Sequence, residues 1–461
     1  RKARPLPPEL RRRLVLLGVL AAAMAPAAAI HPAGLSNAAY PLRTLAYLRA
    51  HDIAGRAGPA GGPAVHPWRT IGEFAAPFGP DMWEFPSTWI LAALLIAAAP
   101  AAAALLACRR WAEAAVLAAA ALAALSMRRN IILPAILAPP LIALAVALAA
   151  AWWRRRSWPA RPLAAAGLAT TALAGVLAGA AVFTVASGRL YRWQRRPMYF
   201  GGGVSRLALP LGPAAFLDAH LPDAGPIHTD YSLSSSMVFF ADRVTAVPTL
   251  TNTWATPRER MDQVFQVSAG RLPPSTLDAW GLDVAVMQGR TNNQGLIRGL
   301  LADDRWALVR LEARFCVFVR RTEAHAALIA GHEITRESFD VGAFIAACRD
   351  ARSTELAALF LGGGTLQAMG WDEAALAVWD ALLNDAYAAG HFEEVWLNRG
   401  VCLTARGEGR LNAGDRAGLD DLRAADHAFQ RALAIRPDYD SAKRNLALVR
   451  QEIRMAAAVL R

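Results

Sequence analysis

The sequence predicts an α-helical polytopic membrane domain, followed by a small α/β domain and then by an α-helical tail of repeated helix pairs. Three observations support this prediction: long apolar runs, an uneven distribution of charge and a self-similar pattern near the C-terminus. Of the 461 residues, 55% are hydrophobic and only 19% are charged, and the mean hydropathy is +0.26. This combination is uncommon in soluble globular chains, so membrane spans are the first feature to consider.

Charge divides the chain into two parts. Residues 1–187 hold 18 Lys and Arg against 6 Asp and Glu, whereas residues 188–461 hold 31 of each. The net charge of +12 therefore lies among the apolar runs, where positive residues orient membrane helices. A nucleic-acid-binding protein would carry a cationic face on its soluble part, so we expect no nucleic-acid partner. The four cysteines form no closely spaced pair, which argues against a disulfide scaffold.

Five apolar runs approach or reach the length of about 20 residues that a helix needs to cross a bilayer. They lie at 14–30, 87–107, 111–126, 131–153 and 163–187. The first run follows an arginine cluster and ends in small residues, so a secretory signal peptide is the alternative to a span there. Together the runs predict a membrane domain over residues 1–187 with about five transmembrane helices and an outer loop at 31–86.

The positive segments predict the topology of this domain. Arg1–Arg13, Arg109–Arg110 and Arg154–Arg161 lie at alternate ends of the predicted spans, and cytoplasmic loops are enriched in Lys and Arg. We therefore expect the N-terminus inside the cell, and both the loop at 31–86 and everything after residue 187 outside it.

One arginine pair departs from this pattern. Arg128, Arg129 and Asn130 lie between the third and fourth runs, at the predicted outer face. Arginine offers paired donors to phosphate oxygens, so the group is a candidate site for a lipid phosphate or a phosphorylated donor. An ordinary helix-end anchor is the alternative.

The outer loop carries a second polar group next to the membrane. His66, Arg69 and Glu73 lie there, close to Trp68 and Phe74. These residue types suit an anionic headgroup, a metal or an acid–base role. A belt of interfacial aromatic residues is the alternative, and the spacing matches no metal motif, so no metal ligands are assigned.

The order of these motifs resembles a known family. Tyr40–Arg43, then Ile71–Phe74, then Arg129–Asn130 before a proline-bearing run are similar to the C-terminal half of bacterial polytopic membrane glycosyltransferases of the GT-C superfamily, relatives of protein mannosyltransferases. Asp304–Val309 and the β-rich Arg314–Arg320 continue the similarity. The resemblance covers about residues 1–322.

The resemblance implies an enzyme of the bacterial inner (cytoplasmic) membrane. Such enzymes transfer a sugar from a polyprenyl-phosphate carrier to an acceptor at the outer face, where a carboxylate of the first outer loop deprotonates the acceptor. That loop should precede residue 1, since the chain begins with Arg1 and resembles a fragment or a processed form, so the catalytic residues stay unknown. Glu73 matches a Glu–aromatic–x–x–Pro position with Phe74 and Pro77. Cofactors are unknown, with a divalent metal as one option for neutralising the leaving phosphate.

Strand and helix patterns alternate over residues 188–322, which predicts a small extracytoplasmic α/β domain with a largely parallel sheet. We expect strands at 226–229, 244–248 and 282–288, helices at 257–268 and 293–301, and a hairpin of 306–309 with 315–319. His228, Asp230, Tyr231 and Ser232–Ser236 follow the first strand, where ligands often bind. A turn held by local hydrogen bonds is the alternative.

A helical linker at 323–352 and a tail of repeated helices at 353–461 complete the prediction. In tetratricopeptide repeats, small residues let two helices pack closely and a proline ends the second. The best match comprises Ala425, Phe429, Ala432 and Pro437. Degenerate copies earlier in the tail give about two and a half repeats, with an insertion around Gly407–Asp421.

Two functions remain open from the sequence. The first is the glycosyltransferase, whose partners would be membrane lipid and a polyprenyl-phosphate sugar donor. The alternative is a non-enzymatic membrane-anchored scaffold whose tetratricopeptide repeats bind a protein partner, although the repeats could instead only cap the α/β domain. A transporter is disfavoured because no charged residue lies centrally in a predicted span.

Overall fold

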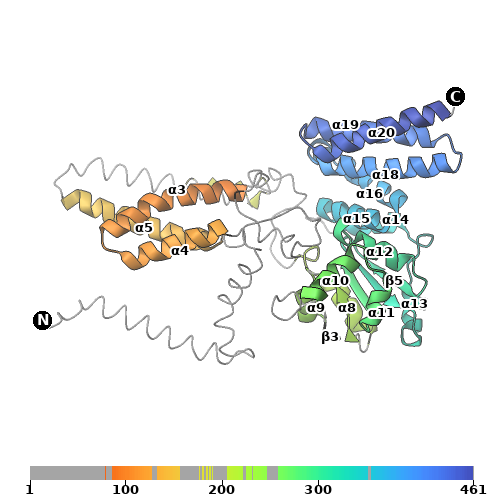
Figure 1. Cartoon of the computed structure of the whole chain (residues 1–461), viewed down its shortest axis with the longest axis horizontal. Helices are drawn as coiled ribbons and strands as arrows, with labels where there is room; N and C mark the ends of the chain where they lie inside the picture. The colour runs from red at the N-terminus through yellow and green to blue at the C-terminus, as the bar shows by residue number, and fades with distance from the viewer. Residues whose placement is uncertain are drawn as a thin grey trace. The chain divides into compact units, whose positions relative to one another are not determined.

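The computed structural model describes residue 78, residues 86–126 and 132–155, scattered positions from 176 to 189, and residues 205–221, 225–230, 232–246, 258–350 and 355–459. The chain divides into two compact units, Arg1–Ala166 and Gly167–Arg461 (Figure 1). Within the described residues the protein is mostly helical, with a small mixed sheet in the second unit.

Three apolar runs form helices in the first unit, with nearly the predicted bounds. They are α3 (Pro86–Ala107), α4 (Trp111–Ser126) and α5 (Ile132–Arg155). The run at 14–30 lies outside the described residues, and the run at 163–187 is described at only a few positions. In the described part of the chain, Thr88–Ala107 and Ile132–Trp152 are long and apolar enough to cross a membrane, whereas α4 is shorter.

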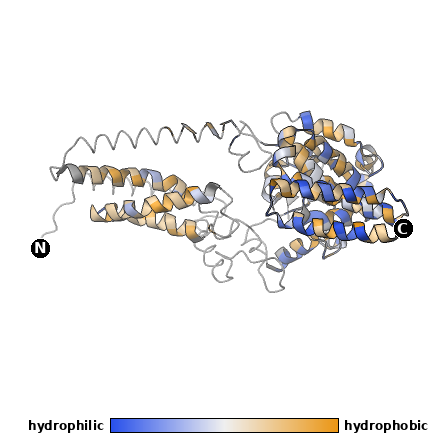
Figure 2. Ribbon diagram, turned by 90° about the horizontal axis from the view of Figure 1, so that it is seen from above, coloured by the Kyte–Doolittle hydropathy of each residue, from blue (hydrophilic) through white to orange (hydrophobic). Residues whose placement is uncertain are grey.

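Mostly small side chains, with a few leucines such as Leu105 and Leu117, lie between these three helices, and many large apolar side chains lie outside them. The shared core is built mainly from alanines, among them Ala98, Ala101 and Ala138. Ile96 and Leu122, by contrast, are exposed by 75% and 67% within the described residues. Figure 2 shows that these helices are hydrophobic over most of their surface. A helix that is apolar all round belongs in a membrane or a large core, and small residues at helix contacts are typical of membrane bundles.

A four-stranded mixed sheet lies at the centre of the second unit, in the order β2–β4–β6–β5. Its strands are β2 (His228–Thr229), β4 (Val284–Gln288), β5 (Trp306–Leu311) and β6 (Phe315–Arg320). Only β2 and β4 are parallel. The expectation of a largely parallel sheet is therefore wrong for these four strands: the short hairpin from β5 to β6 is necessarily antiparallel, and β6 rather than β5 pairs with β4. A separate parallel pair is formed by β1 (Gly225–Pro226) and β3 (Val244–Ala246).

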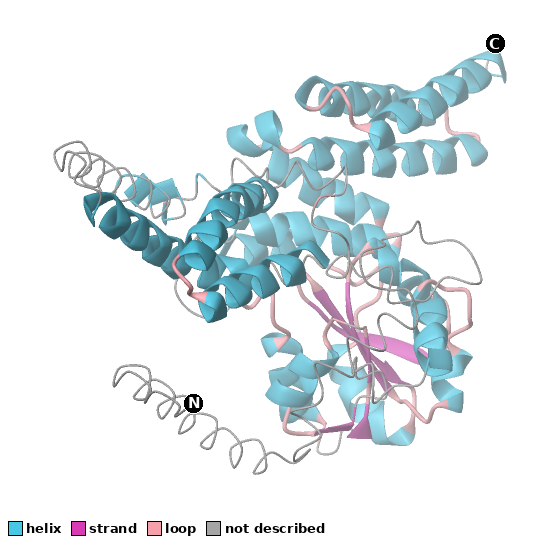
Figure 3. Cartoon of the chain, turned by 60° about the vertical axis from the view of Figure 1, so that its left-hand side comes forward, coloured by secondary structure: helices cyan, strands magenta, loops and turns pink. Residues whose placement is uncertain are grey.

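Helices cover both faces of this sheet (Figure 3). Along β4, Val284 and Val286 face one core whereas Ala285 and Met287 face the other, as the two-residue period of a strand requires. The first face packs against α8 (Leu211–His220), α9 (Ser234–Phe240) and α13 (Ala326–His332). The second face packs against α10 (Arg258–Ser268), α11 (Ser275–Ala279) and α12 (Gln294–Leu301).

The C-terminal tail is a stack of helices that continues from the second face of the sheet. Its helices are α14 (Val341–Asp350), α15 (Glu355–Met369), α16 (Asp372–Leu383), α17 (Ala386–His391), α18 (Glu393–Asn412), α19 (Gly418–Ile435) and α20 (Asp440–Val459). One continuous core runs from Met287 and Phe318 of the sheet to Trp379, Phe429 and Val449 of the tail. The sheet and the tail therefore share their buried surface.

Two of the predicted repeat residues, Ala425 and Phe429, belong to this core. Ala425, Phe429 and Ala432 of α19 are buried, and Pro437 follows the end of that helix. The insertion expected at Gly407–Asp421 is instead mostly helical, because α18 and α19 extend into it. A Cβ added to Gly407 would lie 2.9 Å from the Gly418 carbonyl oxygen, so glycine lets these two helices approach closely.

Candidate functional site

The six residues singled out for lipid-phosphate or donor binding lie outside the described residues. They are His66, Arg69, Glu73, Arg128, Arg129 and Asn130. Their grouping into one site therefore stays a prediction. Tyr231, expected beside the first strand, also lies outside the described residues, whereas its neighbours on both sides are placed.

Asp230 is the centre of a polar group at the end of β2. Its carboxylate is almost fully buried. Oδ1 accepts hydrogen bonds from the backbone N–H of Ser232 at 2.9 Å and from the Ser232 hydroxyl at 2.7 Å. Oδ2 accepts from the backbone N–H of Gln288 at 2.9 Å and from Asn293 Nδ2 at 3.1 Å. The predicted turn thus forms, and the same carboxylate also fastens β2 to β4 and α12.

Two arginines complete this group. Arg290 Nη2 donates to Ser232 Oγ at 2.8 Å and lies 3.3 Å from Asp230 Oδ1. Arg314 donates from Nη1 to the Leu207 carbonyl at 2.8 Å and from Nη2 to Gln288 Oε1 at 3.0 Å. Burial lowers the pKa of Arg314, and the nearby positive charge of Arg290 lowers it further. We call the six residues the strand-end cluster: Asp230, Ser232, Gln288, Arg290, Asn293 and Arg314.

A third of this cluster was predicted from the sequence. Asp230 and Ser232 were candidates because they follow a predicted strand. Gln288 and Arg290 end the next buried strand, and the carboxyl ends of parallel neighbours meet at one edge, so the same rule applied to both strands would have added them. Arg314 comes from the β5–β6 turn, which reaches this edge only because β6 runs antiparallel to β4.

His228 lies beneath the cluster in β2. Its side chain is fully buried, and neither ring nitrogen has a hydrogen-bond partner among the described residues. Burial lowers the pKa of His228 to about 4, against a smaller opposite effect of the Asp230 charge. The ring is therefore neutral at pH 7, and protonating it would place a charge in a site with no acceptor.

We expect the second unit to lose stability as the pH falls from about 6.5 towards 4. The pKa of His228 is lower in the folded than in the unfolded chain, so acid favours the unfolded state, at a cost of up to about 3 kcal/mol. Urea denaturation of the protein at pH 7 and pH 5 measures this difference. The His228→Leu variant cannot titrate there and should show a smaller loss. An identical pH dependence in both proteins would contradict the assignment.

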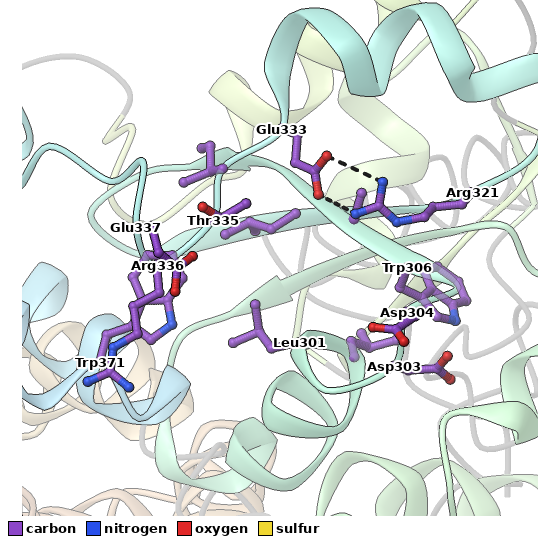
Figure 4. Close-up of a pocket in the computed structure, with 14 residues that line it drawn as sticks. Leu301, Asp303, Asp304, Trp306, Arg321, Glu333, Thr335, Arg336, Glu337 and Trp371 are labelled. Carbon is purple, nitrogen blue, oxygen red and sulfur yellow. Dashed lines mark hydrogen bonds and ion pairs between the residues drawn. The ribbon is translucent and has the colours of Figure 1, made fainter.

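A hollow of about 370 Å³ lies elsewhere, between the end of α12, β5 and the segment after α13. Figure 4 shows Arg321 and Glu333 facing one another on one side, joined by two hydrogen bonds. Asp303 also lines the hollow, and a hydrogen bond from Arg305 lowers the pKa of its carboxyl group. The charges of Arg321, Glu333 and Asp303 are already paired, so this hollow is a weaker candidate for a ligand site than the strand-end cluster.

A second hollow of about 390 Å³ opens on the helical tail, lined by Gly390, His391, Arg431, Ala434 and Ile435. We call it the α17–α19 hollow. The guanidinium of Arg431 lies 5.4 Å from the ring centroid of Trp396, a cation–π distance. The side chains of Ala434 and Ile435 beside the Arg431 cation suit a peptide that presents an apolar and an acidic side chain.

Three of the four described cysteines are poor nucleophiles. Cys316, Cys348 and Cys402 are buried, and burial raises the pKa of all three thiols, that of Cys348 to about 12. A thiolate is the reactive form, so these side chains act as small core residues. The histidines are less scattered than the sequence suggests, because the rings of His220 and His332 lie 4.5 Å apart. No group of three or more metal-ligating side chains occurs among the described residues.

Glu452 of α20 faces Glu408 of α18, and we expect their contact to weaken at alkaline pH. Burial and the Glu408 carboxyl group raise the pKa of Glu452 to about 7. The folded form holds the proton more tightly, so its stability contribution is complete below about pH 4.5 and is lost as the pH rises through 7. Glu452→Gln should protect α20 from hydrogen exchange at pH 8 but not at pH 5. Equal protection at both values would contradict this assignment.

Comparisons with known proteins identify no relative. No known protein family matches the chain. No curated protein matches it, and no solved structure matches it.

Proposed function

We propose that the protein is a GT-C-type membrane glycosyltransferase of the bacterial inner membrane, which transfers a sugar from a polyprenyl-phosphate carrier to an acceptor at the outer face. One observation carries this proposal. Helices α3, α4 and α5 form where the resemblance requires spans, with a core made mainly of alanines and with many large apolar residues exposed outside. Such packing suits lipid rather than water.

The two arginine pairs near α4 fit this scheme. Arg109–Arg110 precede the helix, and Arg128–Arg129 follow it. A 16-residue helix is about 24 Å long at 1.5 Å per residue, shorter than the hydrocarbon region of about 30 Å, so as a span α4 would require local thinning of the bilayer or snorkelling of its flanking arginines. The first pair then lies at the cytoplasmic face and the second at the outer face, where a leaving phosphate needs neutralising charge.

A transfer assay tests the enzyme. Membranes from cells that express the complete reading frame encoding this chain are incubated with radiolabelled polyprenyl-phosphate sugars, and transfer to endogenous acceptors is counted. The Arg128→Gln/Arg129→Gln double variant should lose at least about tenfold in rate. The matched Arg109→Gln/Arg110→Gln variant, at the other end of α4, should retain its rate. Full transfer by the first variant, or none by the unaltered protein with any carrier-linked sugar, would refute the proposal.

The proposed topology is tested separately. The native thiols Cys316, Cys348 and Cys402 are buried and would label slowly from either side. Ala447 of α20 is exposed, so the Ala447→Cys variant provides an accessible thiol in a Cys108→Ser background. A membrane-impermeant maleimide should label it in spheroplasts. Labelling only in inverted vesicles would place the second unit in the cytoplasm.

A protein-binding scaffold is the second candidate, and the α17–α19 hollow favours it. Arg431 has no ion-pair partner among the described residues and lies against Trp396. A photo-crosslinker at Ala434, inside the hollow, should give one discrete adduct in cells, which Arg431→Glu abolishes. The same crosslinker at Ala447 is the control. A scaffold without enzymatic activity would give this adduct and no sugar transfer.

A further inference from the structure

Most hydrogen-bond acceptors of the strand-end cluster already accept a hydrogen bond from another residue. Both carboxylate oxygens of Asp230 accept two or more hydrogen bonds. Gln288 accepts from Arg314 at Oε1 and donates from Nε2 to Ser232 Oγ at 3.0 Å. Asn293 Nδ2 donates to both Asp230 and the Gln288 carbonyl. The polar side chains between the two arginines are thus already bonded to one another.

The unused capacity consists of donors. Arg290 bonds only through Nη2, and its Nε is buried without a partner among the described residues. Arg314 bonds through Nη1 and Nη2, which leaves part of its five N–H groups free. A ligand that completes this cluster must therefore bring acceptors.

Charge selects the same kind of ligand. Two guanidinium groups and one buried carboxylate leave the cluster with one net positive charge. The arginines are held near one another by the Ser232–Gln288 bridge, although they repel. The N-terminus of α12 follows Asn293 and adds partial positive charge. The Arg290 side chain is 41% exposed, so this charge is reachable from solvent.

We propose that Arg290 and Arg314 of the strand-end cluster bind the phosphate oxyanion of a phosphate ester. A guanidinium group can donate two parallel hydrogen bonds to two oxygens of one phosphate. The negative charge of the phosphate would also offset the repulsion between the two guanidinium groups. The ester is either a lipid headgroup or a small soluble molecule. This site does not depend on the proposed sugar transfer, which involves residues near the membrane helices.

Thermal unfolding of the whole protein in neutral detergent provides the first test. Glycerol 3-phosphate, titrated at constant ionic strength against chloride, should raise the unfolding temperature by about 2–4 °C at ten times its Kd. Arg290→Gln should weaken binding at least tenfold, and Arg290→Lys should weaken it less. Arg243→Gln, at an exposed arginine of the same unit, should bind as the unaltered protein does. Equal stabilisation by chloride, or unchanged binding by Arg290→Gln, would overturn the proposal.

Nanodiscs distinguish the two sources of phosphate. If the ligand is a headgroup, phosphatidic acid in phosphatidylcholine discs raises the unfolding temperature and removes the effect of glycerol 3-phosphate. If the ligand is soluble, only glycerol 3-phosphate acts. A lack of response to both would refute the site, whatever the result of the sugar-transfer assay. A positive response with no sugar transfer would refute the enzyme and leave the site standing.

Discussion

Replacing Asp230 with alanine is expected to lower the unfolding free energy of the second unit by about 3–5 kcal/mol, because it removes the charged acceptor on which two strands and a helix converge. The buried Gln288 N–H would lose its acceptor, and the Asn293 amide would lose one of its two acceptors. Asp230→Asn keeps the shape of the side chain, but its amide NH2 group would face groups that themselves donate. We therefore expect this variant to lose about 1–3 kcal/mol of unfolding free energy. Guanidinium denaturation followed by tryptophan fluorescence measures both.

A surface aspartate in the same unit supplies the control for this series. Asp218 accepts a hydrogen bond from the backbone N–H of Arg243 at 2.9 Å, and this bond is exposed to solvent. Asp218→Ala should therefore cost less than about 1 kcal/mol. Equal losses for Asp218→Ala and Asp230→Ala would show that the strand-end cluster does not organise this sheet edge.

Two adjacent glycines of α15 should respond to alanine with opposite signs. A Cβ at Gly363 would lie 2.8 Å from ring atoms of Trp379, which is fully buried. Gly363→Ala is expected to cost about 1–3 kcal/mol through overpacking. A Cβ at Gly364 meets nothing within 4 Å, so Gly364→Ala should gain up to about 1 kcal/mol from helix propensity alone.

Chemical denaturation of the two single variants tests this pair directly. Their unfolded states are nearly identical, since each exchanges one glycine for alanine at neighbouring positions. Any difference in stability therefore reports the native packing of α15 against α16. Similar changes for both variants would mean that α15 does not approach Trp379 as closely as the structure shows.

The sequence predicted those elements whose signals are local. Apolar runs gave α3 to α5 to within a few residues, and the strands of the β5–β6 hairpin were expected where they occur. Strand order was not accessible in this way, because the pairing of β6 with β4 depends on contacts between distant segments. The parallel sheet was accordingly predicted in error, and Arg314 was missed as a site residue.

In the helical tail, too, contacts between different helices could not be predicted from local sequence patterns. The role of Gly362–Gly364 in the interior of α15 depends on Phe344 and Trp379, which lie on other helices. The small residues of α19 were identified correctly from their spacing. Their neighbours across the helix pair, such as Gly400 beside Phe429, became visible only in three dimensions.

The closeness of Gly289 to α15 has a consequence for communication within the second unit. A Cβ at Gly289 would lie 2.2 Å from Thr365 Oγ1. The loop that carries Arg290 is therefore packed tightly against α15. Close-packed interiors transmit strain instead of absorbing it. An anion at the sheet edge that shifts this loop would therefore also shift or strain Thr365 and the helix α15 that carries it.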